Sequence, residues 1–217
     1  MSDIFSEVDE EVRREQLKKL WERYGSLVIA ACVLLVVAVG GWRGYEWWEA
    51  KKAAEAGVAF QVATELAGEG KNKEAEEAFA KIASTGTPSY RMLAKFREAA
   101  EMAGRDPKAA VAMYDQLAAD GTVGRVLQDL AALRAGTILV DTAPYNEIAQ
   151  RLEPLTASDR TFRHSARGAL ALSAWRTKDM TAMRKWSDLV LADPDTPPNT
   201  RGQVQMLLAL ADADKKG

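Results

Sequence analysis

An uncharged apolar run near the N-terminus limits the possible folds of this chain more than any other feature. The run extends from Tyr24 to Trp42, and Arg23 and Arg43 flank it. At about 1.5 Å per residue, a helix of this length spans roughly 28 Å, close to the ~30 Å hydrocarbon core of a bilayer. A helix is the form that satisfies the backbone of such a segment inside lipid. We therefore predict a transmembrane helix over residues 24–45.

Aromatic residues stand at both ends of this run. Their rings combine an apolar body with a polar tip, which suits the boundary between lipid and water. A buried helix of a soluble core is the alternative, but aromatic-flanked uncharged runs of this length are rare in soluble folds. The predicted membrane-interface anchors are Trp21, Tyr24, Trp42, Tyr45, Trp47 and Trp48.

Basic residues indicate the orientation of this segment. Five precede the run and three follow it closely, so we expect residues 1–23 in the cytoplasm and residues 46–217 on the outer side. A cleaved signal peptide is the competing interpretation, because Ala38-Val39-Gly40 has the small residues of a cleavage site. The long region before the run and the aromatic cluster after it favour a retained anchor. The basic residues are Arg13, Arg14, Lys18, Lys19 and Arg23, then Arg43, Lys51 and Lys52.

The sequence of residues 46–217 indicates one all-α domain. Hydrophobic residues make up 47% of the chain, which excludes overall disorder. Glycine and proline separate segments of helix length with a period near 3.6, and no alternating strand pattern appears. The net charge of -2 gives no electrostatic case for nucleic-acid binding. The single cysteine, Cys32, lies within the predicted span, so an intrachain disulfide is excluded.

Four segments share a pattern of one small or apolar residue, a larger residue and an aliphatic residue. They begin at positions 75, 110, 148 and 182. A period near 34 residues with two helices per unit is typical of tetratricopeptide repeats, which must stack because one helix pair cannot bury its apolar face alone. The four triplets are Ala75-Phe79-Ile82, Ala110-Tyr114-Leu117, Ile148-Leu152-Leu155 and Ala182-Trp186-Leu189.

Each triplet is expected in the second helix of an antiparallel pair. The predicted pairs are residues 53–67 with 73–84, 89–103 with 107–119, 125–140 with 145–155, and 162–177 with 181–191. A last helix over residues 200–213 is expected to cap the stack, covering its open end with Val204, Leu207, Leu208 and Leu210. The predicted fold is therefore one N-terminal transmembrane helix followed by a tetratricopeptide-like α-solenoid.

Three stretches carry a resemblance to a known family: MSDIFSEVDEEVRREQLKKLWERYG at the N-terminus, LQDLAALRAG over residues 127–136, and RHSARGALALSAWR over residues 163–176. With one membrane helix before tetratricopeptide-like helices, the chain resembles the YfgM-like family of ancillary subunits of the bacterial Sec translocon, and its alphaproteobacterial type most closely. The resemblance covers nearly the whole chain. It implies a plasma-membrane anchor and periplasmic repeats beside the translocon and a membrane-anchored periplasmic chaperone, in the service of exported proteins.

The chain lacks the motifs of common catalytic sites. It has no G-x-S-x-G, P-loop, HExxH or G-x-G-x-x-G sequence. The only histidine, His164, is expected to be exposed or to line a groove beside Arg163 and Arg167 rather than to bind a metal. We predict a non-enzymatic scaffold with no catalytic residue, cofactor, metal or small-molecule substrate. A hydrolase is the alternative from another class, and the missing nucleophile and base argue against it.

Five arginines on the predicted first helices of the third and fourth units are candidate partner-binding residues. First helices line the concave surface of stacked repeats, so we hypothesise a basic groove that receives an acidic segment of a partner protein. The alternative is ordinary surface arginine paired with neighbours such as Asp129. A scaffold for another envelope assembly, in cytochrome maturation or cell-wall synthesis, is the alternative to the translocon, because a fold does not fix its partner. The five are Arg125, Arg134, Arg163, Arg167 and Arg176.

Overall fold

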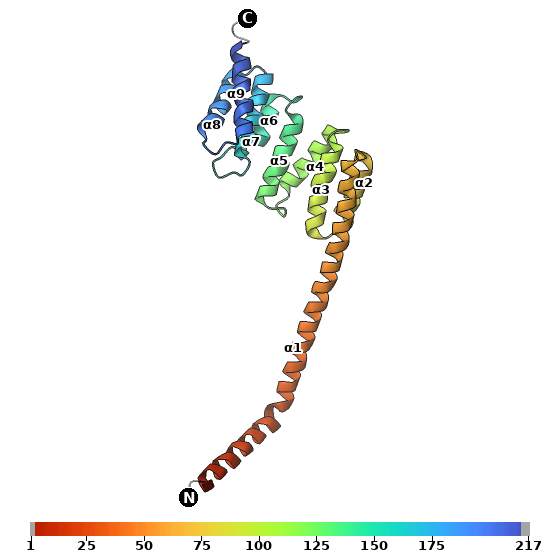
Figure 1. Cartoon of the computed structure of the whole chain (residues 1–217), viewed down its shortest axis with the longest axis vertical. Helices are drawn as coiled ribbons and strands as arrows, with labels where there is room; N and C mark the ends of the chain where they lie inside the picture. The colour runs from red at the N-terminus through yellow and green to blue at the C-terminus, as the bar shows by residue number, and fades with distance from the viewer. Residues whose placement is uncertain (1–2, 214–217) are drawn as a thin grey trace. The chain divides into compact units, whose positions relative to one another are not determined.

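The computed structural model describes the backbone of residues 3–213 and the side chains of residues 18, 19 and 21–213. Within this part of the chain the structure is helical, with no strand, so the all-α prediction is confirmed (Figure 1). Its elements are α1 (Asp3–Gly68), α2 (Asn72–Thr85), α3 (Pro88–Met102), α4 (Pro107–Ala119), α5 (Arg125–Leu139), α6 (Tyr145–Leu152), the 3-10 turn η1 (Glu153–Leu155), α7 (Arg163–Arg176), α8 (Met180–Ala192) and α9 (Pro198–Ala213).

Helix α1 joins three segments that are predicted separately from the sequence. The region before the apolar run, the run itself and the first helix of the repeats form one continuous helix. The physical reason is that no proline occurs before Pro88, so no backbone N–H is missing anywhere along α1. The chain divides into two compact units, Met1–Ala54 and Glu55–Gly217, and each is described by itself.

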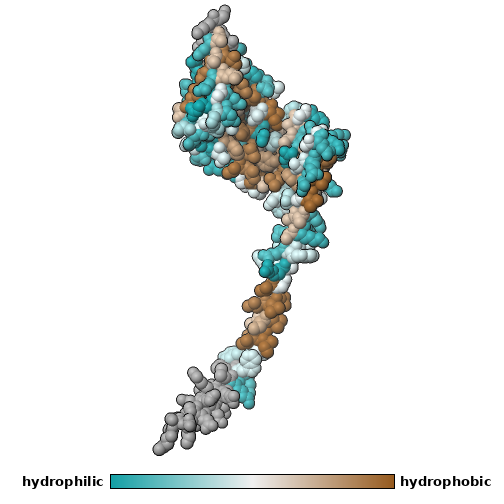
Figure 2. Space-filling view, viewed as in Figure 1, coloured by the Kyte–Doolittle hydropathy of each residue, from teal (hydrophilic) through white to brown (hydrophobic). Residues whose placement is uncertain are grey.

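In the first unit, the aliphatic side chains of α1 have no protein cover. Leu27, Leu34 and Val36 are 66%, 71% and 69% exposed, and Figure 2 shows them as a brown band along the helix. A helix that exposes aliphatic side chains all round needs apolar surroundings. By length and composition, α1 is able to cross a membrane, a test that signal sequences also pass.

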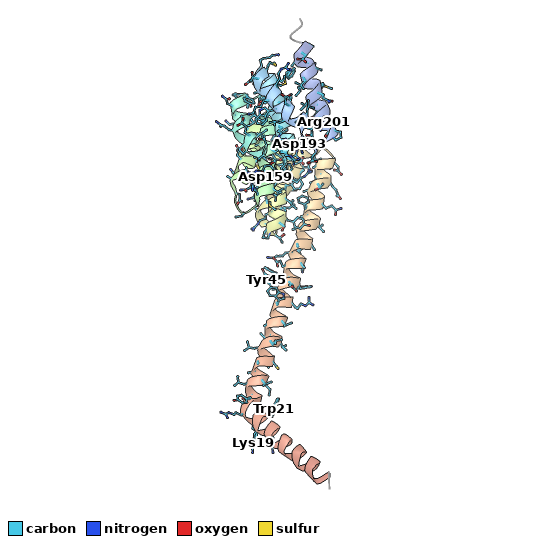
Figure 3. All side chains as sticks on the ribbon, turned by 90° about the vertical axis from the view of Figure 1, so that its left-hand side faces the viewer. Lys19, Trp21, Tyr45, Asp159, Asp193 and Arg201 are labelled. Carbon is cyan, nitrogen blue, oxygen red and sulfur yellow. The ribbon has the colours of Figure 1, made fainter. Side chains whose placement is uncertain are left out.

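The predicted interface anchors are exposed at the two ends of this band. Figure 3 shows Trp21 and Tyr45 on α1, at either end of the apolar run. Cys32 lies between them and is also exposed, as a residue that faces lipid would be. The exposed fractions are 61% for Trp21, 47% for Tyr24, 67% for Trp42, 56% for Tyr45, 68% for Trp47 and 48% for Trp48.

The second unit is a succession of short helices whose bounds lie close to the predicted ones. Helix α4 begins and ends at the predicted residues. Its N-cap Asp106 accepts a hydrogen bond from the backbone N–H of Ala109, and Asp179 does the same for α8 through Ala182. Helix α6 is shorter than predicted, because Pro154 has no N–H and the chain continues as η1.

In three of the four predicted repeats, the triplet residues form the core. Phe79, Tyr114 and Leu152 are at most 2% exposed, and their flanking triplet residues are buried with them. The rings of Phe60 and Phe79 pack edge to face at 5.2 Å, which joins the end of α1 to α2. The fourth triplet differs from the prediction. Leu189 is 40% exposed, and α8 buries Met183, Trp186 and Val190 instead.

Helix contacts also extend beyond the predicted pairs. Helices α7 and α8 pack extensively, as predicted, but so do α2 with α3 and α4 with α5, which join different predicted helix pairs. Helices α5 and α6 nevertheless meet tightly at Gly136, where a Cβ atom would lie 2.7 Å from Cδ2 of Leu152. Glycine at this position therefore lets the two helices pack around a fully buried leucine.

Helix α9 packs against α7 and α8, as expected of a capping helix. Its Val204, Leu207 and Ala211 are buried. Leu210 was expected to be buried too, but it is 45% exposed. The reason is that α9 presents a second apolar stripe, which includes Leu210 and faces a groove.

Candidate partner-binding groove

A groove with a volume of about 500 Å³ lies between α5, α7 and α9. We call it the α5–α7–α9 groove. Every helix that forms it is held by the core of the second unit, so the groove is built into the fold. The residues that line it are Leu133, Thr137, Val140, Ser165, Gly168, Ala169, Leu172, Asn199, Thr200, Gln203, Val204, Met206, Leu207 and Leu210.

None of these lining residues carries a charge, and most of them are apolar. Met206 is 66% exposed and Leu210 is 45% exposed, so large apolar side chains face solvent along one wall. Proteins usually bind their ligands and partners at concave, mostly apolar surfaces of this kind. A volume of this size holds about three or four aliphatic side chains of a partner.

Polar residues line the groove at the start of α7 and α9 and, through Thr137, at the end of α5. Helices α7 and α9 run in the same direction, because Gly168 lies against Thr200 and, further along, Ala174 packs with Ala211. Ser165 and Thr200 belong to the first turns of these helices, whereas the later turns line the groove with aliphatic groups.

An ion-pair cluster closes the turn between α8 and α9. The carboxylate of Asp193 accepts hydrogen bonds from Nε of Arg163 at 2.9 Å and from Nη1 of Arg167 at 3.0 Å. The bond from Arg163 is the main reason why the pKa of Asp193 is lowered to about 2. Arg201 donates to the backbone oxygens of Leu191 and Asp193. Asp193 and Arg201 are labelled in Figure 3. This cluster fixes α9 to α7 and α8, and so fixes one wall of the groove.

The five arginines predicted to bind a partner do not share one surface role. Arg163 and Arg167 belong to the Asp193 cluster, and Arg167 also donates to the carbonyl oxygen of Thr156. Arg176 donates to the carbonyl oxygens of Val140 and Ala143. These three guanidinium groups thus have partners inside the chain, which favours the structural interpretation for them.

The other two arginines lie at the surface. Arg125 pairs with Asp159 at 3.4 Å, and both side chains are 64% exposed. Arg134 is exposed and has no ion-pair partner in the described part of the chain. Asp129, which the alternative interpretation names as a partner, binds Arg160 instead. Partner binding by the five arginines stays a prediction, and Arg125 and Arg134 are the two whose side chains are most exposed for it.

His164 is buried, whereas the sequence predicts that it is exposed or lines a groove. Its Nδ1 lies 3.0 Å from Oγ1 of Thr196, and that hydroxyl group donates to the carbonyl oxygen of Val190. Because the hydroxyl proton is used in this way, the oxygen accepts from Nδ1–H of His164. Burial, followed by the charge of Arg163, lowers the pKa of His164.

This environment predicts a loss of stability in mild acid. The folded chain protonates His164 less readily than the unfolded chain, whose histidine pKa is near 6.5, so the free energy of unfolding falls as the pH drops below about 6.5. Asp193 stays ionised in this range and does not contribute. We expect the melting temperature to fall between about pH 7.5 and 5.5, and to fall less in His164→Gln, whose amide also donates to Thr196. An equal fall in both proteins would contradict the assignment.

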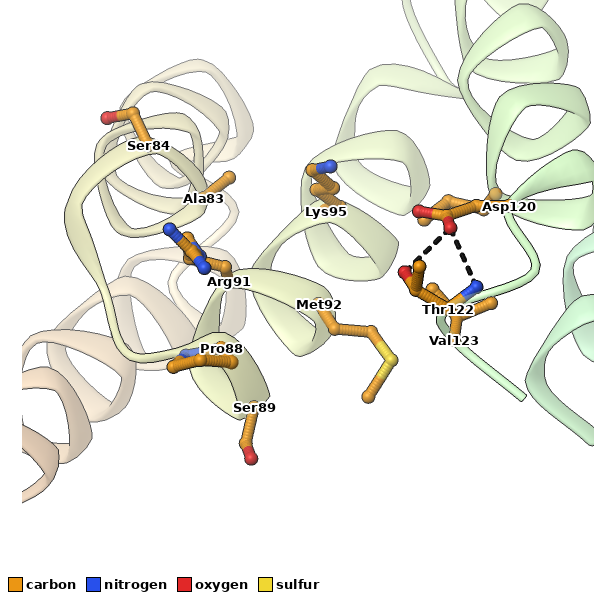
Figure 4. Close-up of a pocket in the computed structure, with 11 residues that line it drawn as sticks. Ala83, Ser84, Pro88, Ser89, Arg91, Met92, Lys95, Asp120, Thr122 and Val123 are labelled. Atoms are coloured by element: carbon orange, nitrogen blue, oxygen red, sulfur yellow. Dashed lines mark hydrogen bonds between the residues drawn. The ribbon is translucent and has the colours of Figure 1, made fainter.

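A second cleft lies between α2, α3 and the end of α4 (Figure 4). Its volume is about 570 Å³, slightly larger than that of the α5–α7–α9 groove. Arg91 and Lys95 line it together with Asp120, whose carboxylate accepts two hydrogen bonds from Thr122. The mixed charges of this cleft select neither an acidic nor an apolar ligand. The α5–α7–α9 groove is therefore the better candidate site.

The groove could not be predicted from the sequence. Its walls come from three helices that are distant in sequence, and Val204, Leu207 and Leu210 were predicted only as residues of the cap. One signal was present: α9 carries more aliphatic residues than one buried stripe requires. A second stripe on a helix indicates either a second contact or a binding surface.

Comparison with known proteins shows the family of this chain. No curated protein and no solved structure matches the chain. A family described as "Tetratricopeptide repeat-like domain" matches residues 18–170, well over half of the chain and including part of α7. Its repeats are a scaffold for protein–protein interaction. With the stacked helices and buried triplets described above, this match shows that the chain belongs to the tetratricopeptide repeat-like domain family.

Proposed function

We propose that the protein is a membrane-anchored scaffold that holds an apolar segment of a partner protein in the α5–α7–α9 groove. The uncharged lining of the groove carries this proposal. A charged side chain brought into the groove would lose its hydration without gaining a counter-charge, so the groove favours neutral segments. Apolar segments gain most because they remove Met206 and Leu210 from water.

The proposed location is the bacterial inner membrane, crossed once by α1, with the N-terminus in the cytoplasm and the repeats in the periplasm. The exposed aliphatic band of α1 and its aromatic ends support the anchor. The excess of lysine and arginine before the band supports the orientation. The proposed organisation is a cytoplasmic segment over residues 1–23, a membrane helix over residues 24–45 and a repeat domain over residues 46–217, capped by α9.

Within this scaffold class, we propose an ancillary subunit of the Sec translocon that links it to a periplasmic chaperone for exported proteins. The resemblance to the YfgM-like family supports this partner. An apolar groove also suits the task, because exported chains expose apolar segments before they fold. A scaffold role excludes none of the other envelope assemblies, so the partner is identified by the experiment below.

The test places a photoreactive residue at position 206, in full-length protein within its native membrane. We expect crosslinks to translocon subunits, to the chaperone or to exported chains. Leu210→Glu is expected to lower the crosslink yield at least about ten-fold, because it buries a charge in an apolar groove. Leu189→Glu is the matched control, because Leu189 is similarly exposed but does not line the groove.

Two outcomes would contradict the proposal. Equal yields in Leu210→Glu and Leu189→Glu would show that the groove does not hold the partner. A carbonate-washed membrane pellet without the full-length chain would favour the cleaved signal peptide over the anchor. Crosslinks confined to cytochrome-maturation or cell-wall proteins would keep the scaffold role and replace the translocon as its partner.

A further inference from the structure

The segment of α1 that follows the apolar run carries two lysines whose ammonium groups lie near tryptophan rings. Nζ of Lys52 lies 3.6 Å from the ring centroid of Trp48, and Nζ of Lys51 lies 5.8 Å from that of Trp47. Each lysine thus reaches back by about one helical turn, toward the apolar run, as side chains of a helix do. The ring face attracts the ammonium group and fixes its position.

The height of these ammonium groups above the apolar run matches a lipid headgroup. Trp42 ends the run, and Trp47 and Trp48 lie about 8–9 Å further along the helix axis. The polar layer on each side of a bilayer is about 5–8 Å thick. That height is near the outer edge of this layer, and because the lysine side chains reach back toward the run, their ammonium groups come within it, where their stems stay in apolar contact and their charges meet headgroups.

Neighbouring charges leave both lysines available. Arg43 is paired with Glu46 at 3.5 Å, and Glu46 also accepts a hydrogen bond from Nε1 of Trp42. The charges of Arg43 and Glu46 therefore neutralise each other. Glu49 is close to Lys52 in sequence, but the ammonium group of Lys52 lies over Trp48. A ring face leaves N–H groups of the ammonium free to donate.

We propose that Lys51 and Lys52, held over Trp47 and Trp48, bind the phosphate of an anionic phospholipid headgroup. The inference rests on the proposed membrane anchoring of α1. A zwitterionic lipid with a choline group fits less well. The aromatic faces that would attract the choline are already occupied by the lysines, and the positive charges of the lysines repel the choline. Each lysine near an anionic surface strengthens binding by about five-fold.

The test reconstitutes the full-length protein in vesicles of phosphatidylcholine and phosphatidylglycerol that contain a spin-labelled form of either lipid. Electron paramagnetic resonance gives the relative affinity of the protein for the two headgroups. We expect a preference for phosphatidylglycerol that falls about two-fold in Lys51→Gln/Lys52→Gln, because the change at this site is averaged over all lipids around the helix. Lys51→Arg/Lys52→Arg is expected to keep the preference.

The matched control is Lys108→Gln/Lys185→Gln in the repeats, where Lys185 lies over Trp186 at 4.3 Å. This control removes the same charge and one similar ring contact, and we expect it to leave the preference unchanged. An unchanged preference in Lys51→Gln/Lys52→Gln would overturn the site while α1 remains an anchor. Loss of the preference on addition of millimolar inorganic phosphate would overturn the lipid as ligand. A chain that does not enter vesicles at all would overturn the anchor as well.

Discussion

Replacing Leu152 by alanine is expected to lower the free energy of unfolding by about 3 kcal/mol. Leu152 is completely buried in the cluster that joins α5, α6, α7 and α8, so the substitution removes apolar contacts and leaves a cavity. Chemical denaturation of the full-length protein in detergent, followed by circular dichroism, measures the change. Leu210→Ala is the control, because Leu210 is 45% exposed, and its effect is expected to be much smaller.

Gly136, which lies against Leu152, provides a second test of the same contact. Gly136→Ala alone is expected to destabilise by about 1–2 kcal/mol, since its new Cβ would lie 2.7 Å from Cδ2 of Leu152. In the double variant that methyl group enters the cavity left by Leu152→Ala. The two losses should therefore add up to about 1 kcal/mol more than the loss of the double variant. Strictly additive losses would show that Gly136 and Leu152 are not in contact.

Arg167→Met is expected to destabilise the protein by about 3 kcal/mol. The side chain is 11% exposed and donates to Asp193, to the carbonyl oxygen of Thr156 and to that of Leu189. Methionine fills much of the space but satisfies none of these acceptors. The same denaturation experiment measures the effect, with crosslinking from position 206 as a second readout. Since the Asp193 cluster fixes α9, the crosslink yield should fall too.

Arg184→Met provides the matched comparison. Arg184 pairs with Asp212 at 2.8 Å, but these side chains are 45% and 57% exposed. An ion pair this exposed is screened by water and contributes less than about 1 kcal/mol. If Arg167→Met were equally mild, the Asp193 cluster would have no part in holding α7, α8 and α9 together.

The helices and most of the core could be predicted from the sequence, because both depend on local spacing. Phe79, Tyr114 and Leu152 recur at the repeat period, and all are buried. The pattern failed in α8, where Leu189 is exposed and Val190 is buried. A shift of one residue turns a helix face by about 100°, and α9, which packs only at this end of the described stack, changes which face is covered.

The ion-pair cluster that fixes one wall of the candidate site could not be predicted in the same way. The sequence places Arg163, His164 and Arg167 together on one helix, and charged residues are exposed by default. Their actual environment depends on Asp193 and Thr196, which lie about thirty residues away and reach them only through the turn after α8. Spacing on one helix carries no information about that turn.

The neutral lining of the α5–α7–α9 groove determines how binding in it depends on the salt concentration. Attraction between opposite charges at a surface weakens as electrolyte is added, because mobile ions gather around each charge. Contacts between aliphatic groups do not weaken in this way, and their signature is a negative change in heat capacity. A ligand held by this groove is therefore retained in dilute and in concentrated electrolyte alike.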